Sequence, residues 1–398
     1  MKVIRLREGK ERSLARRHPW VFQGSIEKGK ADPGETVRVE SHAGEFLAWG
    51  AFSPESQIRV RAWTWDADER IDAAFFERRL ARAIALRARM ALPSDGVRLV
   101  HGEADGLPGL VVDRYGPVLS VQFLSCGVER WKATIADQLL ALTGCTRLYE
   151  RSDASVRQLE GLPPVRAWLR GGSDDPAASQ VTIHESGWRL TVDVAEGHKT
   201  GYYLDQRDNR ARFAQLVKQY GCRSVLNCFS YTGGFSVAAL AGGSAEVISV
   251  DSSAAALELA KEHVALNGFD AARHAVLDAD VNATLREMLQ QGRTFDAIVL
   301  DPPKFAPTAA HADRASRAYK DINRLALKLL APGGLLLTFS CSGGISADLF
   351  HKIVAGAAMD AQVDGALIAR LEGAADHPTT LMFPEGEYLK GLAILKQA

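Results

Sequence analysis

Residues 224–236 read SVLNCFSYTGGFS, an apolar run followed by a turn with two glycines. The run Ser224–Asn227 predicts a strand covered on both faces, because such strands are almost continuously apolar. Gly233 and Gly234 let a ligand approach the backbone where this strand turns into a helix. The spacing differs from the GxGxxG dinucleotide fingerprint, and the chain has no P-loop GK[ST]. The stretch therefore favours binding of a ligand without a pyrophosphate. The alternative is a tight turn that binds no ligand.

The chain on either side of this stretch, from about residue 188, alternates short apolar runs with helical patterns. Such alternation is typical of a parallel sheet with helical crossovers. We predict a doubly wound α/β sheet, to which Gly391–Lys396 returns antiparallel as an edge. The predicted strands are Ser224–Asn227, Glu246–Val250, Ala275–Leu277, Phe295–Leu300 and Leu335–Ser340. The predicted helices include Ser253–Asn267 and Asp313–Leu330.

Ligands of an open α/β sheet bind beyond the carboxyl ends of its strands, so the residues after each strand are candidates. Asp251 ends the second strand, where a carboxylate can accept hydrogen bonds from both ribose hydroxyls. It could instead cap the next helix, and both roles are compatible if Ser252 or Ser253 is the cap. Asp278 and Asp280 follow the third strand, where an acid can reach an adenine amino group.

Two further strand ends carry candidate chemistry. The fourth strand is followed by Asp301-Pro302-Pro303-Lys304-Phe305, whose prolines stiffen the loop and withhold two backbone donors. Such a loop can present carbonyl groups to a flat base. The fifth strand ends at Ser340-Cys341-Ser342, which places a thiol at the same edge of the sheet.

The thiol of Cys341 has two interpretations. Free cysteines are usually small, buried and inert, whereas the position at the sheet edge favours a reactive group. A helix N-terminus near Ser346, or Lys304 if the loops converge, would favour the thiolate. Cys228, inside the first turn, is the rival thiol.

The composition excludes several classes of protein. Apolar residues make up 46% and charged residues 24% of the 398 residues, unlike collagen-like, coiled-coil or wholly disordered chains. No run approaches the roughly 20 apolar residues of a membrane-spanning helix, and the N-terminus lacks the apolar segment of a secretory signal. Five scattered cysteines without a CxxC pair, together with dispersed histidines, predict a reducing cytoplasm and no metal site.

The charges balance over the whole chain, with 48 Lys and Arg against 48 Asp and Glu, but they are unevenly placed. Residues 1–30 hold nine Lys or Arg and three Glu, a net charge of +6, so the remaining residues sum to −6. In this segment Arg16 and Arg17 lie near Trp20 and Phe22, a combination that can bind phosphates and stack on bases. A solvated basic face is the alternative.

Three domains are predicted. Residues 1–73 contain runs of alternating apolar and polar residues separated by turns, which indicate a small β-barrel. Residues 74–186 are predicted to form a small mixed α/β domain. Residues 187–398 are predicted to form the doubly wound sheet. The predicted elements of the second domain are strands at Val97–His101, Leu110–Tyr115 and Val118–Leu124, a helix at Val128–Leu142, a strand at Arg147–Glu150 and a further strand at Val181–His184.

Together these motifs resemble a known family. The part from about residue 188 resembles the class I S-adenosylmethionine-dependent methyltransferases. The whole chain resembles the bacterial large-subunit ribosomal RNA methyltransferase I family, which makes 5-methylcytosine in 23S rRNA. The motifs that carry the resemblance are His18–Phe22, Gly106–Tyr115, Tyr149–Asp153, Lys199–Arg207, Asp301–Phe305, Tyr319–Asn323, Phe339–Ser342 and Tyr388–Gly391.

The resemblance implies a PUA-type RNA-binding barrel, a small α/β domain and a Rossmann-like methyltransferase domain. It implies S-adenosyl-L-methionine as cofactor and 23S rRNA or the assembling large ribosomal subunit as partner, without membrane or metal, and it allows a homodimer. The turn 231–235 would hold the methionine part of the cofactor, Asp251 its ribose and Asp280 its adenine. The implied cofactor-binding residues are Gln206, Arg207, Asn227, Phe229, Tyr231, Thr232, Gly233, Gly234, Phe235, Asp251, Ser252, Asp280 and Asp301.

The resemblance also assigns catalytic and substrate-binding residues. Cys341 is the expected nucleophile, and Asp301 the expected donor near N3 of the base. A thiolate that attacks C6 of cytosine gives C5 the carbanion character that it needs to accept a methyl group. The residues expected to bind substrate are Pro302, Pro303, Lys304, Phe305, Arg16, Arg17 and Trp20.

Two alternative functions remain at this point. A methyltransferase acting on an exocyclic amino group of adenine or guanine would use a similar Asp-Pro-Pro loop, but its chemistry needs no thiol. A non-catalytic RNA-binding or ribosome-assembly protein would keep the fold without the reaction, and it would not need Asp251, Asp301 and Cys341 together.

Overall fold

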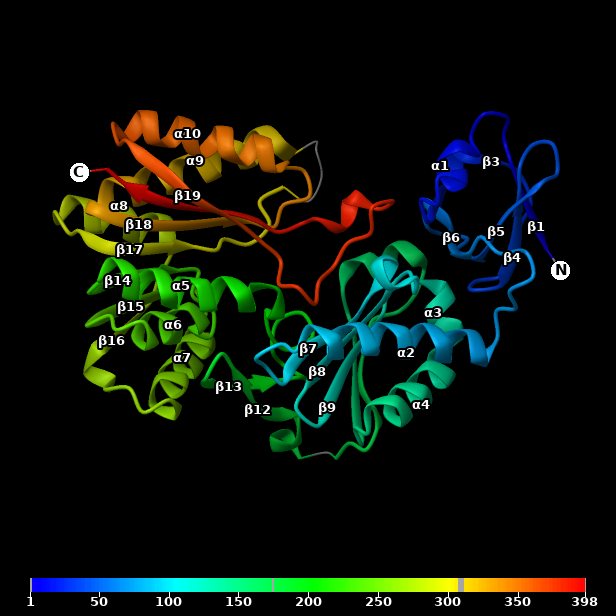
Figure 1. The fold of residues 1–398 in the computed structure, drawn as a ribbon, viewed down its shortest axis with the longest axis horizontal. Coiled ribbons are helices and arrows are strands. Elements are labelled where there is room, and N and C mark those ends of the chain that lie inside the picture. The colour runs from blue at the N-terminus through cyan, green and yellow to red at the C-terminus, as the bar shows by residue number, and fades with distance from the viewer. Residues whose placement is uncertain (1, 174, 307–310, 398) are drawn as a thin grey trace. The chain divides into compact units, whose positions relative to one another are not determined.

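The structure is a computed structural model that describes residues 2–173, 175–306 and 311–397 (Figure 1). The chain divides into two compact units, and each is described by itself. The first unit comprises Met1–Glu185, Thr191–Leu204 and Ala375–Gly386, and the second comprises Ser186–Leu190, Asp205–Ala374 and Glu387–Ala398. Among the described residues, no helix combines the length and apolar character needed to cross a membrane.

The first unit begins with a six-stranded sheet in the order β2-β6-β5-β4-β1-β3. Its elements are β1 (Val3–Leu6), α1 (Arg12–Ala15), β2 (Trp20–Phe22), β3 (Ile26–Lys28), β4 (Thr36–Glu40), β5 (Phe46–Phe52) and β6 (Ile58–Thr64). In β4 every second residue is buried, and Val37 and Val39 pack with Ile4 and Leu6 in one hydrophobic core. The alternating runs predicted as strands in this part are therefore confirmed.

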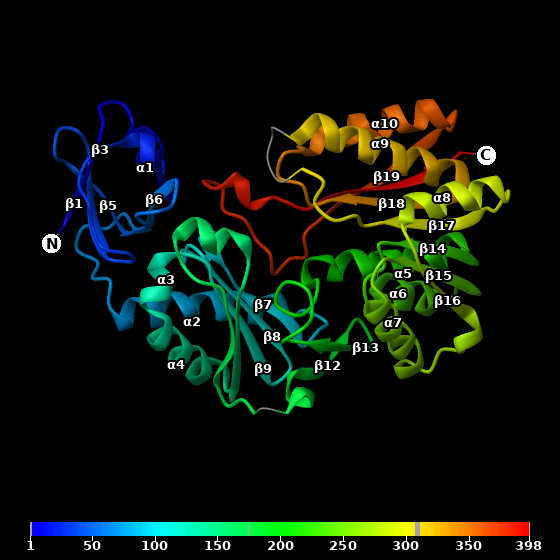
Figure 2. The ribbon, with the colours of Figure 1, turned by 180° about the vertical axis from the view of Figure 1, so that it is seen from behind.

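A five-stranded sheet follows in the order β11-β10-β9-β8-β7. Its elements are α2 (Ala73–Met90), β7 (Gly96–His101), β8 (Leu110–Tyr115), β9 (Val118–Phe123), α3 (Cys126–Arg130), α4 (Lys132–Thr143), β10 (Arg147–Ser152) and β11 (Val165–Arg170). Helices α2 and α4 lie beside this sheet (Figure 2). Their side chains pack with those of the sheet in a second core. That core also includes Ala51 and Trp63 from the first sheet. The domain boundary after residue 73 stays a prediction.

One of the predicted elements in this part was wrong. The helix expected at Val128–Leu142 is interrupted at Trp131, whose ring packs 4.8 Å from the ring of Phe76 on α2. The strand predicted at Val181–His184 is confirmed as β12 (Gln180–Glu185), which forms a two-stranded ribbon with β13 (Trp188–Asp193) outside the five-stranded sheet. The fifth strand of the sheet is instead β11, which the sequence did not predict, because most of its side chains are at least partly exposed.

A buried ion pair and the hydrogen bonds around it join distant segments of the first unit. The guanidinium of Arg98 donates to both carboxylate oxygens of Asp113 at 2.7 Å, and the Thr200 hydroxyl donates to the same carboxylate. Asp376 accepts a hydrogen bond of 2.9 Å from the backbone amide of Arg98. Residues 375–386 therefore belong to this unit although they come late in the sequence.

The second unit contains a seven-stranded sheet in the order β16-β15-β14-β17-β18-β20-β19. Its strands are β14 (Ser224–Cys228), β15 (Glu246–Asp251), β16 (His274–Asp278), β17 (Phe295–Leu300), β18 (Leu330–Ser340), β19 (Gly365–Glu372) and β20 (Lys390–Lys396). Its helices are α5 (Arg207–Tyr220), α6 (Gly234–Ala241), α7 (Ala254–Leu266), α8 (Val281–Gln290), α9 (Ala312–Leu329) and α10 (Ala347–Ala361). Helices α5, α6 and α7 lie on one side of the sheet and α8, α9 and α10 on the other (Figure 1).

This arrangement confirms the predicted doubly wound sheet. Strands β16, β15, β14, β17 and β18 are parallel, and β20 returns antiparallel to β18. The prediction that Gly391–Lys396 forms the edge was wrong, because β19 pairs with its outer side. Burial of Leu392, Ala393 and Ile394 fits this inner position, whereas only Leu371 is buried in the edge strand β19.

Candidate active site

The parallel strands β15, β14, β17 and β18 end at one edge of the sheet in the second unit, where a doubly wound fold binds its ligands. Asp251 is the last residue of β15, Asp301 follows β17, and Cys341 follows β18. Between them, β14 leads into the turn 229–233. The structure therefore brings the ends of four predicted strands together at this edge.

The turn after β14 has an unusual backbone. Phe229, Tyr231 and Gly233 have φ values of 57°, 48° and 75°, in the left-handed region that non-glycine residues seldom occupy. A Cβ atom at Gly233 would lie 2.7 Å from the Cβ of Ala260, so helix α7 leaves room only for glycine. Strained backbone of this kind often occurs at ligand sites, where the surrounding structure holds it in place.

Asp251 is one of the groups that hold this turn. Its Oδ2 accepts a hydrogen bond of 2.8 Å from the amide of Tyr231, and its Oδ1 accepts one of 3.0 Å from the amide of Ser253. Ser253 is the N-cap of α7, because its Oγ accepts from the amide of Ala256. Ser253 is therefore the helix cap. Asp251 is partly exposed, and each of its carboxylate oxygens retains a lone pair for a further donor.

A second support comes from His263 on α7, which sequence reasoning missed. A ring nitrogen of this buried histidine lies 2.7 Å from the carbonyl oxygen of Thr232. Below the turn, a chain of hydrogen bonds links Asn227 to Ser236, Ser236 to Ser249, and Ser249 to His274 on β16. Burial lowers the pKa of His274 to about 4, so this ring is neutral at pH 7.

Several buried polar atoms in or next to the turn, and one just before α5, have no hydrogen-bond partner among the described residues. They are the Oδ1 of Asn227, the Oγ of Ser230, the Oγ1 of Thr232 and the Nε2 of Gln206. Buried polar groups in native proteins are almost always satisfied, so a cluster of unsatisfied ones fits a polar ligand. The amino acid and ribose parts of S-adenosylmethionine carry the donors and acceptors that would satisfy them.

Other predicted cofactor residues have structural contacts of their own. Gln206 and Arg207 are buried at the start of α5, where Oε1 of Gln206 accepts from Nδ2 of Asn209 at 2.6 Å. The buried ring of Phe235 packs against the rings of Phe213 and Phe339.

The two remaining polar candidates lie at helix starts. Asp280 is exposed and caps α8, since its Oδ1 accepts from the amide of Ala283 at 2.8 Å. Ser252 is exposed directly before the N-cap of α7. Both side chains are accessible to a ligand at the carboxyl edge of the sheet.

The loops that carry Asp301 and Cys341 are joined to each other. Sγ of Cys341 lies 3.9 Å from the carbonyl oxygen of Pro302. The buried Oγ of Ser342 accepts hydrogen bonds from the amides of Phe305 and Ala306, at 3.2 and 3.1 Å. The sequence alone left open whether the loops that carry Lys304 and Cys341 converge, and in the structure they do.

Tyr319 on α9 lies under this junction. Its hydroxyl accepts from Oγ of Ser340 at 3.0 Å and lies 2.9 Å from Oγ of Ser342. Burial raises its pKa, so the phenol stays neutral at pH 7. Tyr319 also packs against the ring of Phe305, at 4.8 Å between centroids. Tyr319 belongs to the family motif Tyr319–Asn323, but the sequence alone indicates no role for its side chain.

Cys341 differs from the other four cysteines in its accessibility. It is partly exposed between the buried Ser340 and Ser342, whereas the others are buried. Burial raises the pKa of Cys126 and Cys222 to about 11 and that of Cys228 further still. Since the thiolate is the nucleophilic form, the rival Cys228 is poorly suited to nucleophilic attack.

The predicted RNA-binding residues near the N-terminus lie in the first unit. Arg16 and Arg17 are exposed. The Trp20 indole donates to Oε1 of Glu103 at 2.8 Å, and its ring packs 4.7 Å from that of Phe383. Phe22, with 47% of its surface exposed, is more accessible to a base than Trp20.

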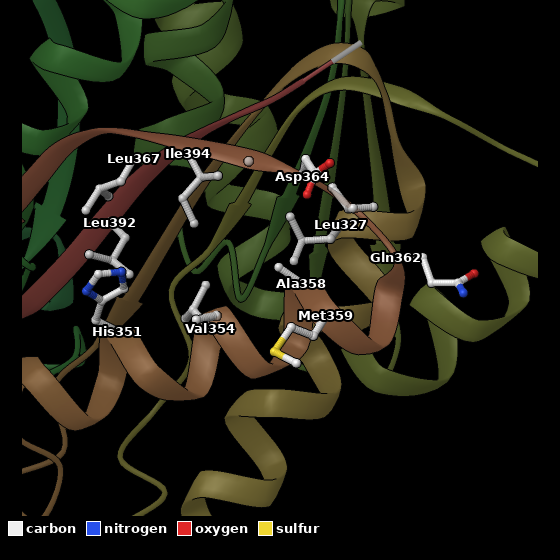
Figure 3. Close-up of a pocket in the computed structure, with 13 residues that line it drawn as sticks. Leu327, His351, Val354, Ala358, Met359, Gln362, Asp364, Leu367, Leu392 and Ile394 are labelled. Atoms are coloured by element: carbon white, nitrogen blue, oxygen red, sulfur yellow. The ribbon is translucent and has the colours of Figure 1, made fainter.

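A cavity of about 640 Å³ lies elsewhere in the second unit, between α10 and the strands β19 and β20 (Figure 3). Val354, Ala358, Leu392 and Ile394 give it a largely apolar lining. It contains none of the predicted site residues among those described, so the candidate site stays at the carboxyl edge of the parallel strands.

Comparison with known proteins agrees with this architecture. Residues 164–383 match the family model of S-adenosylmethionine-dependent methyltransferases, and residues 4–65 match that of a PUA-like domain. A ribosomal RNA large subunit methyltransferase I from Shewanella denitrificans is 50% identical over 98% of both chains. The chain belongs to this family. The relative of the same name from Klebsiella pneumoniae strain 342 is 49% identical over 98% of this chain and 96% of its own.

Membership of the methyltransferase I family establishes the class of enzyme. The protein is an S-adenosylmethionine-dependent methyltransferase with an N-terminal PUA-like domain. A solved structure from Streptococcus mutans, described as a SAM-dependent methyltransferase, has the same fold, with a TM-score of 0.84 at 22% identity over 99% and 100% of the two chains. A methyltransferase solved in complex with SAH has a TM-score of 0.86 at 22% identity and the same coverage.

Proposed function

We propose that this protein methylates C5 of a cytosine in 23S rRNA through a covalent bond between Sγ of Cys341 and C6 of the base. The names of the relatives support large-subunit ribosomal RNA as the substrate. The observation that carries the reaction type is the place of Cys341, a partly exposed thiol next to the Asp301–Phe305 loop. An amino-group methyltransferase would have no use for a thiol there.

The reaction needs a nucleophile because cytosine C5 does not accept a methyl group directly. Attack by the Cys341 thiolate forms the S–C6 bond and moves the electrons of the C5=C6 double bond towards C5. S-adenosylmethionine, when bound, would supply the methyl group: the electron pair at C5 takes it up, and the electrons of the broken sulfur–methyl bond would stay on the cofactor, which leaves as S-adenosylhomocysteine. The C5 proton then leaves to a base or to water, its bonding electrons restore the C5=C6 double bond, and the electrons of the S–C6 bond return to sulfur.

The proposal assigns roles to the remaining site residues. Within the cofactor set, the turn 231–235 binds the methionine part, Asp251 the ribose and Asp280 the adenine. Asp301, protonated, donates towards N3 of the cytosine. The residues that receive the RNA are Pro302, Pro303, Lys304, Phe305, Arg16, Arg17 and Trp20. The homodimer stays a prediction.

Nucleoside analysis tests the proposed product. We expect 23S rRNA from cells that lack this protein to gain 5-methylcytidine, at one position, when it is incubated with the purified enzyme and S-adenosylmethionine. Mass spectrometry of the digested RNA measures this gain. A methylated adenosine or guanosine in its place would contradict the proposal and support amino-group methylation. Absence of both product and cofactor binding would support a non-catalytic RNA-binding protein.

The role of Asp251 can be tested without RNA. In the D251N variant we expect about 10- to 100-fold weaker binding of S-adenosylhomocysteine, because charge-assisted hydrogen bonds to the ribose are lost. Isothermal titration calorimetry measures the affinity. D270N is the matched control, since Asp270 also caps a turn but lies before β16, away from the carboxyl edge. Equal affinities in the two variants would exclude the ribose contact.

A further inference from the structure

Lys390, the first residue of β20, lies beside the loop that carries Cys341. In the antiparallel pairing of β18 with β20, Lys390 is opposite Ser340, the residue before Cys341. Its Nζ donates to the carbonyl oxygens of Ser342 and Ile345, at 2.8 and 2.6 Å. These two bonds place an ammonium group on the short loop between β18 and α10.

The charges of Lys390 and Cys341 interact. Burial lowers the pKa of Lys390, the nearby Cys341 raises it, and Lys304 lowers it. The attraction between two charges is mutual, so a thiolate that stabilises the ammonium is stabilised by it to the same extent. Because Lys390 is half-buried, water screens its charge less than that of an exposed lysine.

We propose that Lys390 is a positioning residue that holds Cys341 in its thiolate form and fixes the loop 341–345 around it. The thiol proton leaves to water, and Lys390 keeps its own proton throughout. Lys390 acts through Cys341 and does not contact the reacting base. The inference rests on the proposed function in one respect: that function is what gives the Cys341 thiolate a use in the reaction.

Two other sources of positive field were expected from the sequence. Lys304 is exposed, so solvent and salt weaken its effect on the thiol. The N-terminus of α10, capped by Ser346, has a field that falls off within the first turn of the helix. Lys390 is the half-buried charge bonded directly to the carbonyls of the loop.

Alkylation of Cys341 tests the proposal directly. The rate of modification by iodoacetamide is measured against pH in the folded full chain, with peptide mass spectrometry to assign the site. Because the other four cysteines are buried, the fast phase reports on Cys341, and C341S gives the background. The variants are K390M, which removes the charge, and K390R, which keeps it.

Strand β20 supplies a matched control. Lys396, at the other end of the strand, also donates to two backbone carbonyls, those of Leu327 and Leu330, at 3.3 and 2.7 Å. Burial is the cause of its lowered pKa. K396M therefore removes a similar carbonyl-bonding lysine without a thiol beside it.

We expect the alkylation curve of K390M to move to higher pH by about one unit, which is about a tenfold lower rate at neutral pH. K390R and K396M are expected to follow the wild-type curve. A loop-fixing role alone would leave the midpoint unchanged. Coincident curves for K390M and the wild type would overturn the proposal.

The reverse measurement needs no change at Lys390, and it decides the matter if K390M does not fold. Without the thiolate, the ammonium loses its stabilisation, so Lys390 should lose its proton at lower pH in C341S than in the wild type. Acylation of its amine, followed by peptide mass spectrometry across pH, measures this shift. Unchanged acylation of Lys390 in C341S would contradict the proposal.

The outcome is independent of the product that the enzyme makes. If K390M shifts the alkylation curve but nucleoside analysis finds no 5-methylcytidine, the charge coupling stands and the proposed function fails. If 5-methylcytidine forms but the alkylation curves coincide, the proposed function stands and the role of Lys390 fails.

Discussion

C341A is expected to lose methyl transfer to RNA by at least about 10³-fold while it still binds S-adenosylhomocysteine. Loss of a covalent nucleophile removes the reaction path itself, which is why effects of this size follow. Transfer of a labelled methyl group into RNA measures the reaction, and calorimetry measures cofactor binding. Preserved binding separates a chemical defect from a folding defect.

The control for this experiment is C228A. Cys228 ends β14 in the core next to the cofactor turn, so its removal tests a second thiol near the same site. We expect C228A to retain methylation. As a further measurement, RNA containing 5-fluorocytidine should trap a denaturation-resistant complex with the wild type but not with C341A, because the fluorine at C5 cannot leave as a proton does. An active C341A would refute the covalent mechanism.

D113A is expected to lower the free energy of unfolding of the first unit by about 3–5 kcal/mol. Asp113 is fully buried and bonds the Arg98 guanidinium through both oxygens, so its removal leaves a buried charge without compensation. The D113A variant also loses the hydrogen bond that the Thr200 hydroxyl donates to Asp113 from a distant part of the sequence. The lowest transition in urea denaturation, followed by circular dichroism, measures the change.

An exposed ion pair of the same unit supplies the matched control. Asp137 pairs with Arg170 at 2.8 Å, and their side chains are 63% and 42% exposed. Exposed pairs contribute about 0–1 kcal/mol, so D137A should unfold close to the wild-type urea concentration. Equal destabilisation by D113A and D137A would show that burial of the Asp113 pair is not what stabilises this unit.

Much of the second unit was predictable from local pattern. The apolar run Phe295–Leu300 forms β17 with the predicted bounds, and the other four predicted strands differ mainly at their ends. Such runs are informative because a strand covered by helices on both faces has nowhere to place polar side chains. The choice of Ser253 as helix cap was also among the alternatives that the sequence offered.

Elements with weak or mixed patterns were missed. β19 was not predicted, although it contains the short apolar run Ala366–Ala369, and only Leu371 among its residues is buried. Trp131 divides the helix expected at Val128–Leu142, and it does so where its ring contacts Phe76 from another helix. The assignment of residues 375–386 to the first unit depends on Asp376 bonding Arg98, a contact that no local pattern encodes.

The sequence by itself determined the alternating α/β order, and with it the edge of the sheet where Asp251, Asp301 and Cys341 had to gather. That step needs only strand direction, because parallel strands carry the residues that follow them to one side. The tertiary structure alone decided what surrounds the thiol. Tyr319 from α9 and Lys390 from β20 both bond Ser342, the residue after Cys341, because an antiparallel strand returns beside β18 and a helix packs beneath the loop.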